Sequence, residues 1–115
     1  MNRFAAPIAE QIWDMKYRFK EADGTPIDAT VEDSWGRIAK DLAKVEDDPE
    51  HWEEQFYAAL EDFKYLPAGR ITAGAGTARN VTLFNCFVMG TIPDSMGGIF
   101  EMLKEAALTM QQGGG

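Results

Sequence analysis

The sequence predicts a mainly α-helical chain whose second part begins an α/β unit. Two observations support this fold class. The first part of the chain carries three stretches in which apolar residues recur at helical spacing. From Leu66 onward the composition changes, and a small-residue loop leads into an apolar run, a turn and a fourth amphipathic stretch. We therefore expect an all-α region over residues 1–65 and the start of an α/β domain over residues 66–115.

Length and composition limit the classes of protein to which the chain can belong. Its 115 residues correspond to one domain or a part of one, and 45% of them are hydrophobic, which suffices for a modest core. The net charge of −8 argues against non-specific nucleic-acid binding, which depends on phosphate contacts. The sequence shows neither a long apolar run typical of a membrane span nor a signal-peptide pattern. Because a single cysteine cannot form an internal disulfide, we expect a cytoplasmic protein.

Three helices are expected in the first part of the chain. The first spans about 7–19 and opens with a proline, which suits the first helical position. The second spans about 30–45, where Thr30 and Asp33 form a capping-box pattern. The third spans about 49–64. Their apolar stripes are typical of packed helices, and core anchors are expected at three tryptophans: Trp13, Trp35 and Trp52.

Neither the single histidine nor the acidic cluster indicates a metal site. His51 has no second histidine or cysteine near it in the sequence. The acidic residues between positions 46 and 54 lie on or beside a predicted helix, where consecutive side chains diverge and do not converge on one cation. We interpret this cluster as a solvated face that also complements a helix N-terminus. No metal ligand is predicted.

The stretch from Gly69 to Ala78 is rich in glycine, alanine and threonine and is predicted to be a loop. Small side chains allow backbone amides to approach a ligand, and Arg70 and Arg79 bracket the stretch. An anion-binding loop and a plain tight loop both agree with this pattern. It lacks the lysine of a Walker loop and the glycine spacing of a dinucleotide-binding turn.

The apolar run Val81–Met89 is predicted to be a strand that is covered on both faces. It contains Cys86, the only cysteine of the chain. From the residues alone, this cysteine is either a small buried hydrophobe or a reactive thiol. Asp94 or Ser95 is then expected to cap a helix that ends at the glycines 113–115. The wide apolar stripe of this helix must cover either the sheet of this chain or a partner helix.

From Leu66 the chain reads LPAGRI…NCFV…PDSMGGIFEMLKEAALTMQQGGG, which resembles the start of the catalytic ten-stranded barrel of ribonucleotide reductase large chains. Three motifs occur in order: Leu-Pro before the small-residue loop, a cysteine in an apolar run, and Asp-Ser at the start of a helix that ends in three glycines. The upstream part is similar to the all-α N-terminal region of the same family. The greatest similarity is to the adenosylcobalamin-dependent (class II) group.

The resemblance implies a catalytic role for Cys86. In this family the matching cysteine faces the 2′ position of the substrate ribose and gives a proton to the departing hydroxyl. It ends in a disulfide with a second cysteine from a later strand, and a thiol can supply both the proton and the electron. The resemblance also implies a set of substrate-binding positions: Ala68, Gly69, Asn85, Gly113, Gly114 and Gly115. Some members carry threonine at the position of Ala68, which lacks that hydroxyl.

The start of the last helix matches the specificity-effector site of the family, at Asp94, Ser95 and Met96. The helix itself, over 94–112, matches the one that pairs two subunits, so a homo-oligomer is expected. The implied partners are a ribonucleotide substrate, a nucleotide effector and a thioredoxin-type reductant, and neither nucleic acid nor a membrane is implied. Adenosylcobalamin is implied as the cofactor of the complete enzyme, with most of its contacts outside this chain and none expected on the fragment.

Three interpretations of the chain stay open at this point. In the family, the radical-carrying cysteine and the second redox cysteine lie on later strands, and one cysteine cannot supply both a radical and a disulfide. The preferred interpretation is therefore an N-terminal, truncated portion of a reductase that is inactive alone. The first alternative is a stand-alone helical dimerisation module derived from the reductase. The second is a fragment of a class I large chain, which works with a separate radical-generating subunit and without cobalamin.

Overall fold

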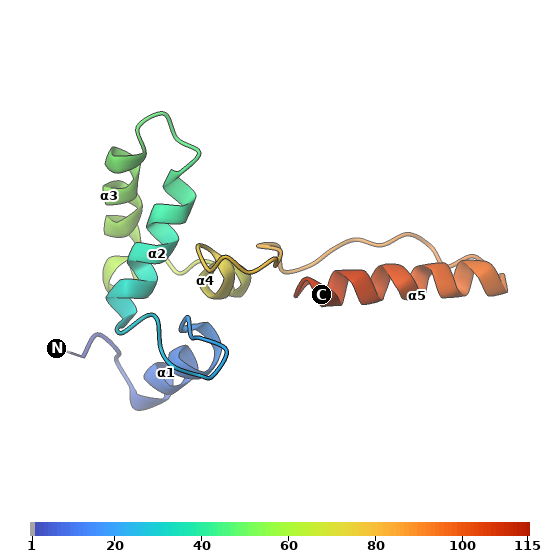
Figure 1. The fold of residues 1–115 in the computed structure, drawn as a ribbon, viewed down its shortest axis with the longest axis horizontal. Coiled ribbons are helices and arrows are strands. Elements are labelled where there is room, and N and C mark those ends of the chain that lie inside the picture. Colours follow the sequence, from blue (N-terminus) through green and yellow to red (C-terminus); the bar gives the residue numbers. More distant parts are fainter. Residues whose placement is uncertain (1) are drawn as a thin grey trace.

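The computed structural model describes residues 2–115 as helices joined by turns and extended segments (Figure 1). The prediction of a mainly α-helical chain is confirmed. The elements, in chain order, are α1 (Pro7–Ile12), η1 (Trp13–Tyr17), α2 (Val31–Ala43), α3 (Pro49–Leu60), η2 (Glu61–Phe63), α4 (Gly69–Gly74) and α5 (Met96–Gln111).

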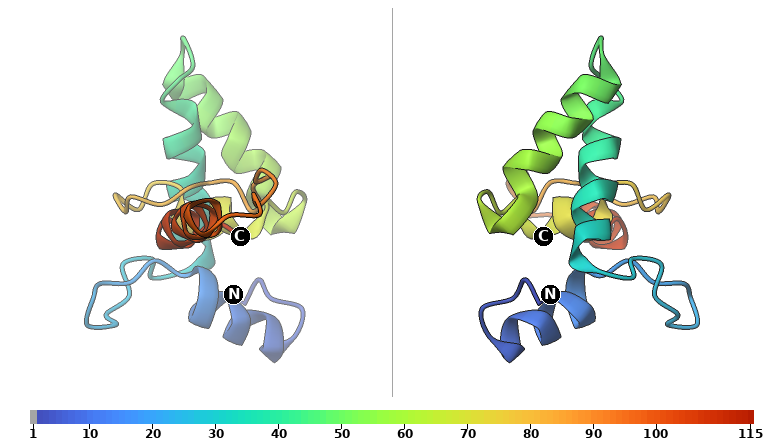
Figure 2. Two further views of the ribbon diagram at one scale, coloured as in Figure 1. Left: turned by 90° about the vertical axis from the view of Figure 1, so that its right-hand side faces the viewer. Right: turned by 90° about the vertical axis from the view of Figure 1, so that its left-hand side faces the viewer.

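The molecule has two visibly different parts, which give it extents of 58 × 37 × 26 Å (Figure 1). The helical body comprises α1 to α4, and in it α2 and α3 form an antiparallel hairpin (Figure 2). The arm comprises residues 81–115, in which an extended segment leads away from the helical body and α5 returns toward it (Figure 1). No helix formed by residues 2–115 combines the length and the apolar character that crossing a membrane would need.

The first predicted helix, over 7–19, changes its winding partway. Pro7 opens α1, and the turn that follows, η1, is π-helical. Such wider turns occur as local insertions in α-helices. The helical region ends before Arg18, whose backbone is extended. Trp13, the first residue of η1, is buried against α2, where its indole Nε1 donates a hydrogen bond to the hydroxyl of Ser34 at 3.0 Å.

The hairpin of α2 and α3 supplies most of the buried residues, and all but Leu60 of these lie on α2. The capping box of Thr30 and Asp33 is present at the start of α2, as predicted. Asp48 caps α3, because its carboxylate accepts a hydrogen bond from the backbone N–H of His51 at 3.4 Å. The core contains residues from η1, α2, α3 and the end of α4: Trp13, Val31, Trp35, Ile38, Ala39, Leu60 and Ala75.

The three tryptophans do not share one role. Trp13 and Trp35 are core residues, as predicted. Trp52 is 40% exposed, so its prediction as a core anchor is wrong. It lies on the surface of α3, where its ring contacts the rings of His51 and Phe56. The buried residue of α3 is Leu60, and Phe56 and Tyr57 are partly buried against the core.

The prediction of a loop over Gly69–Ala78 is wrong for its first part, which forms the short helix α4. The residues after α4 pack directly on α2. Ala75 is buried, and Gly76 has a positive φ of 74°. A Cβ atom at Gly76 would lie 2.8 Å from Cγ of Arg37 and 3.0 Å from its backbone oxygen. The small side chains are therefore required by close packing between two segments of the chain.

The prediction of a strand over Val81–Met89 is also wrong, because the structure contains no β-strand within residues 2–115. The run is extended, but it lacks the two neighbouring strands whose backbone groups would complete a sheet. Phe84 is 71% exposed and Val88 is fully exposed, so the faces predicted to be covered are open. The helix that follows, α5, is present as predicted, yet none of its residues Met96–Gln111 is buried.

Candidate functional site

Cys86 lies where the extended segment of the arm meets the glycine turn after α5. The N–H of Gly115 donates to the backbone oxygen of Asn85 at 3.1 Å. The N–H of Phe87 donates to the backbone oxygen of Gly115 at 3.0 Å. Two bonds of this kind, on either side of one residue, are the pattern that a parallel pair of strands forms. Cys86 is therefore held beside Gly115 in a parallel arrangement.

The start of α4 reaches the same place. The backbone N–H of Arg70 donates to Oδ1 of Asn85 at 3.3 Å. A Cβ atom at Gly113 would lie 2.9 Å from Nη1 of Arg70, so the guanidinium lies over the glycine turn. A Cβ atom at Gly114 would lie 2.5 Å from the ring of Phe87. Close backbone approach thus explains two of the three glycines.

The predicted substrate-binding residues fall into one neighbourhood. Asn85 and the glycines 113–115 are linked by direct contacts, and Ala68 and Gly69 join them through Arg70, the next residue along α4. Behind them, a Cβ atom at Gly69 would lie 3.5 Å from the ring of Tyr17. The structure therefore brings together the positions that the sequence places at 68–70, 85–86 and 113–115.

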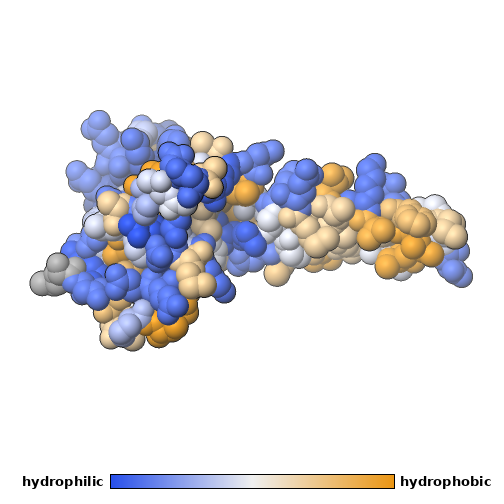
Figure 3. All heavy atoms as spheres, turned by 60° about the horizontal axis from the view of Figure 1, so that its bottom comes forward, coloured by the Kyte–Doolittle hydropathy of each residue, from blue (hydrophilic) through white to orange (hydrophobic). Residues whose placement is uncertain are grey.

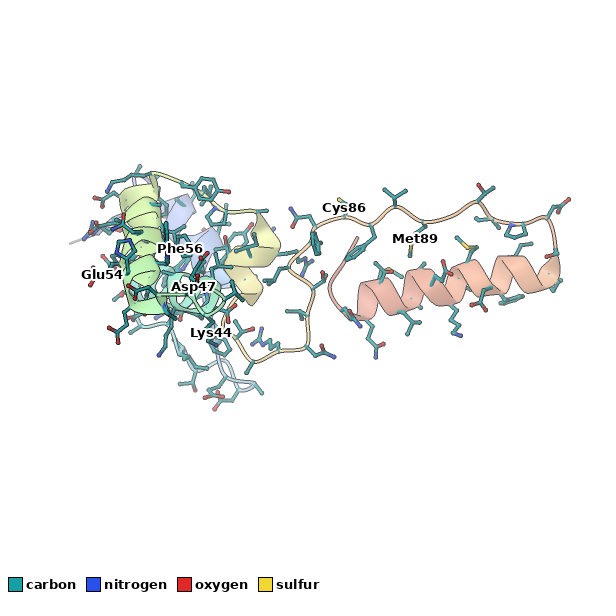
Figure 4. All side chains as sticks on the ribbon, turned by 90° about the horizontal axis from the view of Figure 1, so that it is seen from above. Lys44, Asp47, Glu54, Phe56, Cys86 and Met89 are labelled. Carbon is teal, nitrogen blue, oxygen red and sulfur yellow. The ribbon has the colours of Figure 1, made fainter. Side chains whose placement is uncertain are left out.

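The thiol of Cys86 is free and exposed. Figure 4 shows the side chains of Cys86 and Met89 on opposite sides of the extended segment, with Met89 toward α5 and Cys86 away from it. This alternation is expected of an extended backbone, because the two residues are separated by an odd number of positions. The face that carries Cys86 is consequently open to a ligand or to another part of a protein.

The predicted effector residues occupy the other end of the arm. Ser95 caps α5, because its hydroxyl accepts a hydrogen bond from the N–H of Gly98 at 3.1 Å. Asp94, the other predicted cap, is exposed and does not cap the helix. Met96 is 74% exposed at the first helical position. Cys86 lies beside the C-terminal end of α5 and this group lies at its N-terminal end, so the length of the 16-residue helix separates them in space. The structure therefore does not bring the two groups together.

Sequence reasoning missed a buried polar network at the base of α4. Nη2 of Arg37 lies 3.0 Å from Oδ2 of Asp28, and their side chains are only 8% and 4% exposed. The hydroxyl of Ser34 donates to the same carboxylate at 2.6 Å and accepts from Trp13. One signal for it was present, because Ser34 lies at helical spacing between Val31 and Ile38 as a polar residue within an apolar stripe.

A cavity with a volume of about 630 Å³ lies in the helical body. Its lining is mainly aromatic and aliphatic and includes Trp13, Trp35 and Leu66. It borders Gly69 of α4, but neither Cys86 nor the glycine turn lines it. Within residues 2–115, no three side chains of His, Cys, Asp or Glu gather where a metal ion would bind.

Comparison with known families places the helical body. The family described as "Ribonucleotide reductase, all-alpha domain" matches residues 3–80, which is more than half of the chain. The chain belongs to this family. The matched residues include all of α1 to α4, so the helical body corresponds to the reductase all-α domain.

Named reductases also match the chain. The alpha subunit of ribonucleoside-diphosphate reductase from Helicobacter pylori is 34% identical over 100 residues, which cover 87% of this chain and 12% of that subunit. The corresponding subunit from Chlamydia muridarum is 30% identical over 97 residues, which cover 84% of this chain and 9% of that subunit. A vitamin B12-dependent ribonucleoside-diphosphate reductase from Mycobacterium tuberculosis is 32% identical over 105 residues, which cover 87% and 15%. No solved structure gives a significant match.

The matched stretches cover residues of both the helical body and the arm. The chain spans between 9% and 15% of the length of these curated relatives. The stretch matched by the Helicobacter pylori reductase subunit covers 100 of the 115 residues, so it includes Cys86 wherever it begins. Similarity to reductases therefore extends beyond the all-α domain into the arm.

Proposed function

We propose that this chain is an N-terminal part of a ribonucleotide reductase that converts ribonucleotides to deoxyribonucleotides by thiol chemistry. The observation that carries the proposal is that segments 68–70 and 113–115 contact the backbone and side chain of segment 85–86, where the thiol of Cys86 is exposed. In this proposal, residues 1–65 are the all-α region. Residues 66–115 begin the ten-stranded catalytic barrel, and the parallel pairing of Cys86 with Gly115 supports that assignment.

Cys86 would supply one of two reducing thiols. In the net reaction the 2′ C–O bond of the ribose breaks, a C–H bond forms, and the hydroxyl leaves as water. Two thiols give up two electrons and two protons and become a disulfide. Because this chain has one cysteine, the second thiol must come from outside it. The chain alone is therefore proposed to be inactive, and a thioredoxin-type protein would reduce the disulfide of the complete enzyme in the cytoplasm.

The phosphate groups of the substrate would contact Arg70. A guanidinium group suits this role because it donates two parallel hydrogen bonds to a phosphate. Among residues 2–115, no hydrogen bond or ion pair engages the guanidinium of Arg70, which lies over the glycine turn. Arg79 differs, because its Nη2 donates to the backbone oxygen of Lys20 at 3.0 Å and its guanidinium lies over the ring of Phe19. Asn85 would contact the ribose beside Cys86.

The far end of the arm would bind the nucleotide effector. Since Ser95 alone caps α5, the carboxylate of Asp94 is left to accept hydrogen bonds from ribose hydroxyls. The apolar side chains of α5 are exposed, and Figure 3 shows apolar residues gathered along the arm. We place a second copy of α5 on this face, so that the complete enzyme is a homodimer with effector sites beside the paired helices.

Most contacts of adenosylcobalamin would lie outside this chain. The cavity in the helical body is apolar and does not border Cys86, so a cofactor held there would not face the thiol. No step of the proposal passes through this cofactor. Relatives named vitamin B12-dependent and relatives not so named match with 32% and 34% identity, so the proposal includes class II and class I enzymes alike.

A chimeric reductase tests the proposal. The matching N-terminal stretch of the Helicobacter pylori subunit would be replaced by this chain, and deoxyribonucleotide formation would be measured with the parent chimera and with Cys86→Ser. The parent should be active. The variant should bind substrate and lose net product, because a serine hydroxyl forms no disulfide. Equal turnover by the two chimeras would contradict the thiol role.

The exposed apolar residues of α5 favour a second candidate function, a helical dimerisation module. In that case Cys86 would serve packing, and self-association would be the sole activity of the chain. The chimera separates the two functions, because a module without catalytic residues would give no deoxyribonucleotide although the chimeric protein folds and dimerises.

A further inference from the structure

Arg37 joins three separate parts of the helical body through one buried side chain. Its guanidinium forms the ion pair with Asp28 described above. Its remaining N–H groups donate to backbone oxygens: Nη1 to Ala75 at 2.6 Å, and Nη2 to Thr72 at 3.1 Å and to Tyr17 at 3.4 Å. Arg37 therefore fixes the end of α4 to both α2 and η1.

These bonds hold a helix that has little support of its own. α4 has six residues, none of them buried, and a helix this short is not stable in isolation. Its last carbonyl groups have no partner within the helix, and a cation at that end satisfies them and interacts favourably with the helix dipole. At Gly76 the backbone then passes within van der Waals contact of Arg37 itself. The position of α4 thus depends on this arginine.

The other end of α4 contributes to the candidate site. Arg70 is the second residue of the helix, and its N–H donates to the side chain of Asn85, the neighbour of Cys86. A displacement of α4 would move Arg70 away from the glycine turn and would remove the partner of Asn85. A continuous path of contacts therefore leads from the buried pair to Asn85, the neighbour of Cys86.

We propose that Arg37 is a positioning residue of the thiol site, because it holds α4 where Arg70 and Asn85 orient the substrate against Cys86. This inference rests on the proposed function of Cys86. It assigns to the all-α domain a direct part in the geometry of the active site. The competing explanation is a buried ion pair that stabilises the whole helical body without a specific effect on α4.

Substitution by lysine separates these explanations. Lysine retains a positive charge for Asp28 but has neither the planar fork nor the number of donors that reach Thr72 and Ala75. Arg37→Lys should therefore keep the body folded and release α4. Arg18→Lys is the matched control, because Arg18 donates to the backbone oxygens of Asp28 and Ala29 on the opposite side of the same network.

The measurement is amide hydrogen exchange by NMR on the 115-residue chain. In Arg37→Lys, the amides of Ile71, Thr72 and Ala75 should exchange about tenfold faster or more, while those of α2 and α3 keep their protection. Arg18→Lys should leave the α4 amides protected. Unchanged exchange in α4, or an equal loss of protection in every helix, would overturn the proposal.

A second variant acts on the end of α4 and leaves both charges of the ion pair in place. Gly76→Ala places a Cβ atom against Arg37 at a positive φ, so it should detach the end of α4 and give the same local pattern of exchange. In the chimeric reductase, Arg37→Lys should lower kcat/KM about tenfold at an almost unchanged Tm. If the chimera has no activity with any side chain at position 37, the thiol function fails, while exchange still decides whether Arg37 holds α4.

Discussion

Gly115 brackets Cys86 with two backbone hydrogen bonds, donating to the oxygen of Asn85 at 3.1 Å and accepting from the N–H of Phe87 at 3.0 Å. The two segments run parallel, and α5 is the connection between them (Figure 1). A parallel pair requires such a crossover, usually a helix. The arm is therefore organised as a β-α-β connection even though neither of its ends is a strand.

The glycine turn is the first place to test this organisation. Gly114→Ala adds a Cβ atom 2.5 Å from the ring of Phe87, so the turn should shift and the bonds around Cys86 should weaken. Exchange of the Phe87 amide should become faster. Gly97→Ala is the matched control, because nothing lies within 4 Å of its Cβ position, and it should stabilise α5 by about 0.5–1 kcal/mol. An unaffected Phe87 amide in the Gly114 variant would contradict the pairing.

Arg70 and Arg79 give a matched pair for the phosphate contact. Arg70→Met should weaken binding of a ribonucleoside diphosphate to the chimeric reductase about tenfold to a hundredfold, because a charge-assisted hydrogen bond contributes about 1.5–3 kcal/mol. Arg79→Met removes the same charge from a side chain already engaged by Lys20 and Phe19 and should have little effect. Isothermal titration at two salt concentrations measures both. Equal losses for the two variants would indicate a general charge effect.

Self-association of the chain should depend on α5. Leu103 is 58% exposed on a helix with no buried residue, and exposed stripes of this kind mark interaction surfaces. Light scattering at tens of micromolar should show a dimer or larger species that Leu103→Asp dissociates. Val45→Asp, at an 88% exposed position on the helical body, should leave the assembly unchanged. A monomeric parent chain would be the contrary result.

Acid should destabilise the fold partly through Asp14. Hydrogen bonds from Arg18 and Lys20 lower the pKa of its carboxyl group below the usual 3.8. The folded state then binds this proton more weakly than the unfolded state, so the stabilisation is complete above pH 3.8 and is lost as the pH falls through the lower pKa. Asp14→Asn should reduce the difference in Tm between pH 6 and pH 3.

The control for that experiment is Asp47→Asn, because the structure of residues 2–115 gives Asp47 no ion pair and no hydrogen bond. This substitution changes the net charge by the same amount and should leave the Tm difference close to that of the parent. If both variants narrow the difference equally, the acid sensitivity reflects net charge and not the contacts of Asp14.

The helices that the sequence predicts well are those with local signals. The capping box of Thr30 and Asp33 and the apolar spacing of α2 are readable within a dozen residues, and both occur in the structure. α4 escaped prediction because its two glycines and its threonine have low helix propensity, and because Arg37, which holds it, lies on another helix. The strand over Val81–Met89 depends on neighbours that no local pattern supplies.

The residues of the candidate site also differ in whether a local sequence signal predicts them. The resemblance of the sequence to the reductase family predicts Cys86, Asn85 and the glycines as site residues, and the structure brings these positions together. The sequence offers both Asp94 and Ser95 as caps of α5, and only the geometry of the Ser95 hydroxyl decides between them. Asp28 and Arg37 gave no signal, because a charged residue in a loop and another on a helix look like surface residues until the fold buries them.

Because Ser95 caps α5 and Asp94 does not, substitutions at these two adjacent residues should affect different properties: helix stability at Ser95 and effector binding at Asp94. Ser95→Ala removes the hydroxyl that accepts from Gly98, so α5 should lose about 1 kcal/mol of stability. Asp94→Asn leaves the cap intact and should not change the Tm, yet it should weaken effector binding in the chimeric reductase, because a carboxylate accepts stronger hydrogen bonds from ribose hydroxyls than an amide does. Thermal unfolding and titration with a nucleoside triphosphate measure the two effects. If Asp94→Asn instead destabilises α5 with no effect on nucleotide binding, its carboxylate serves the helix and not the effector.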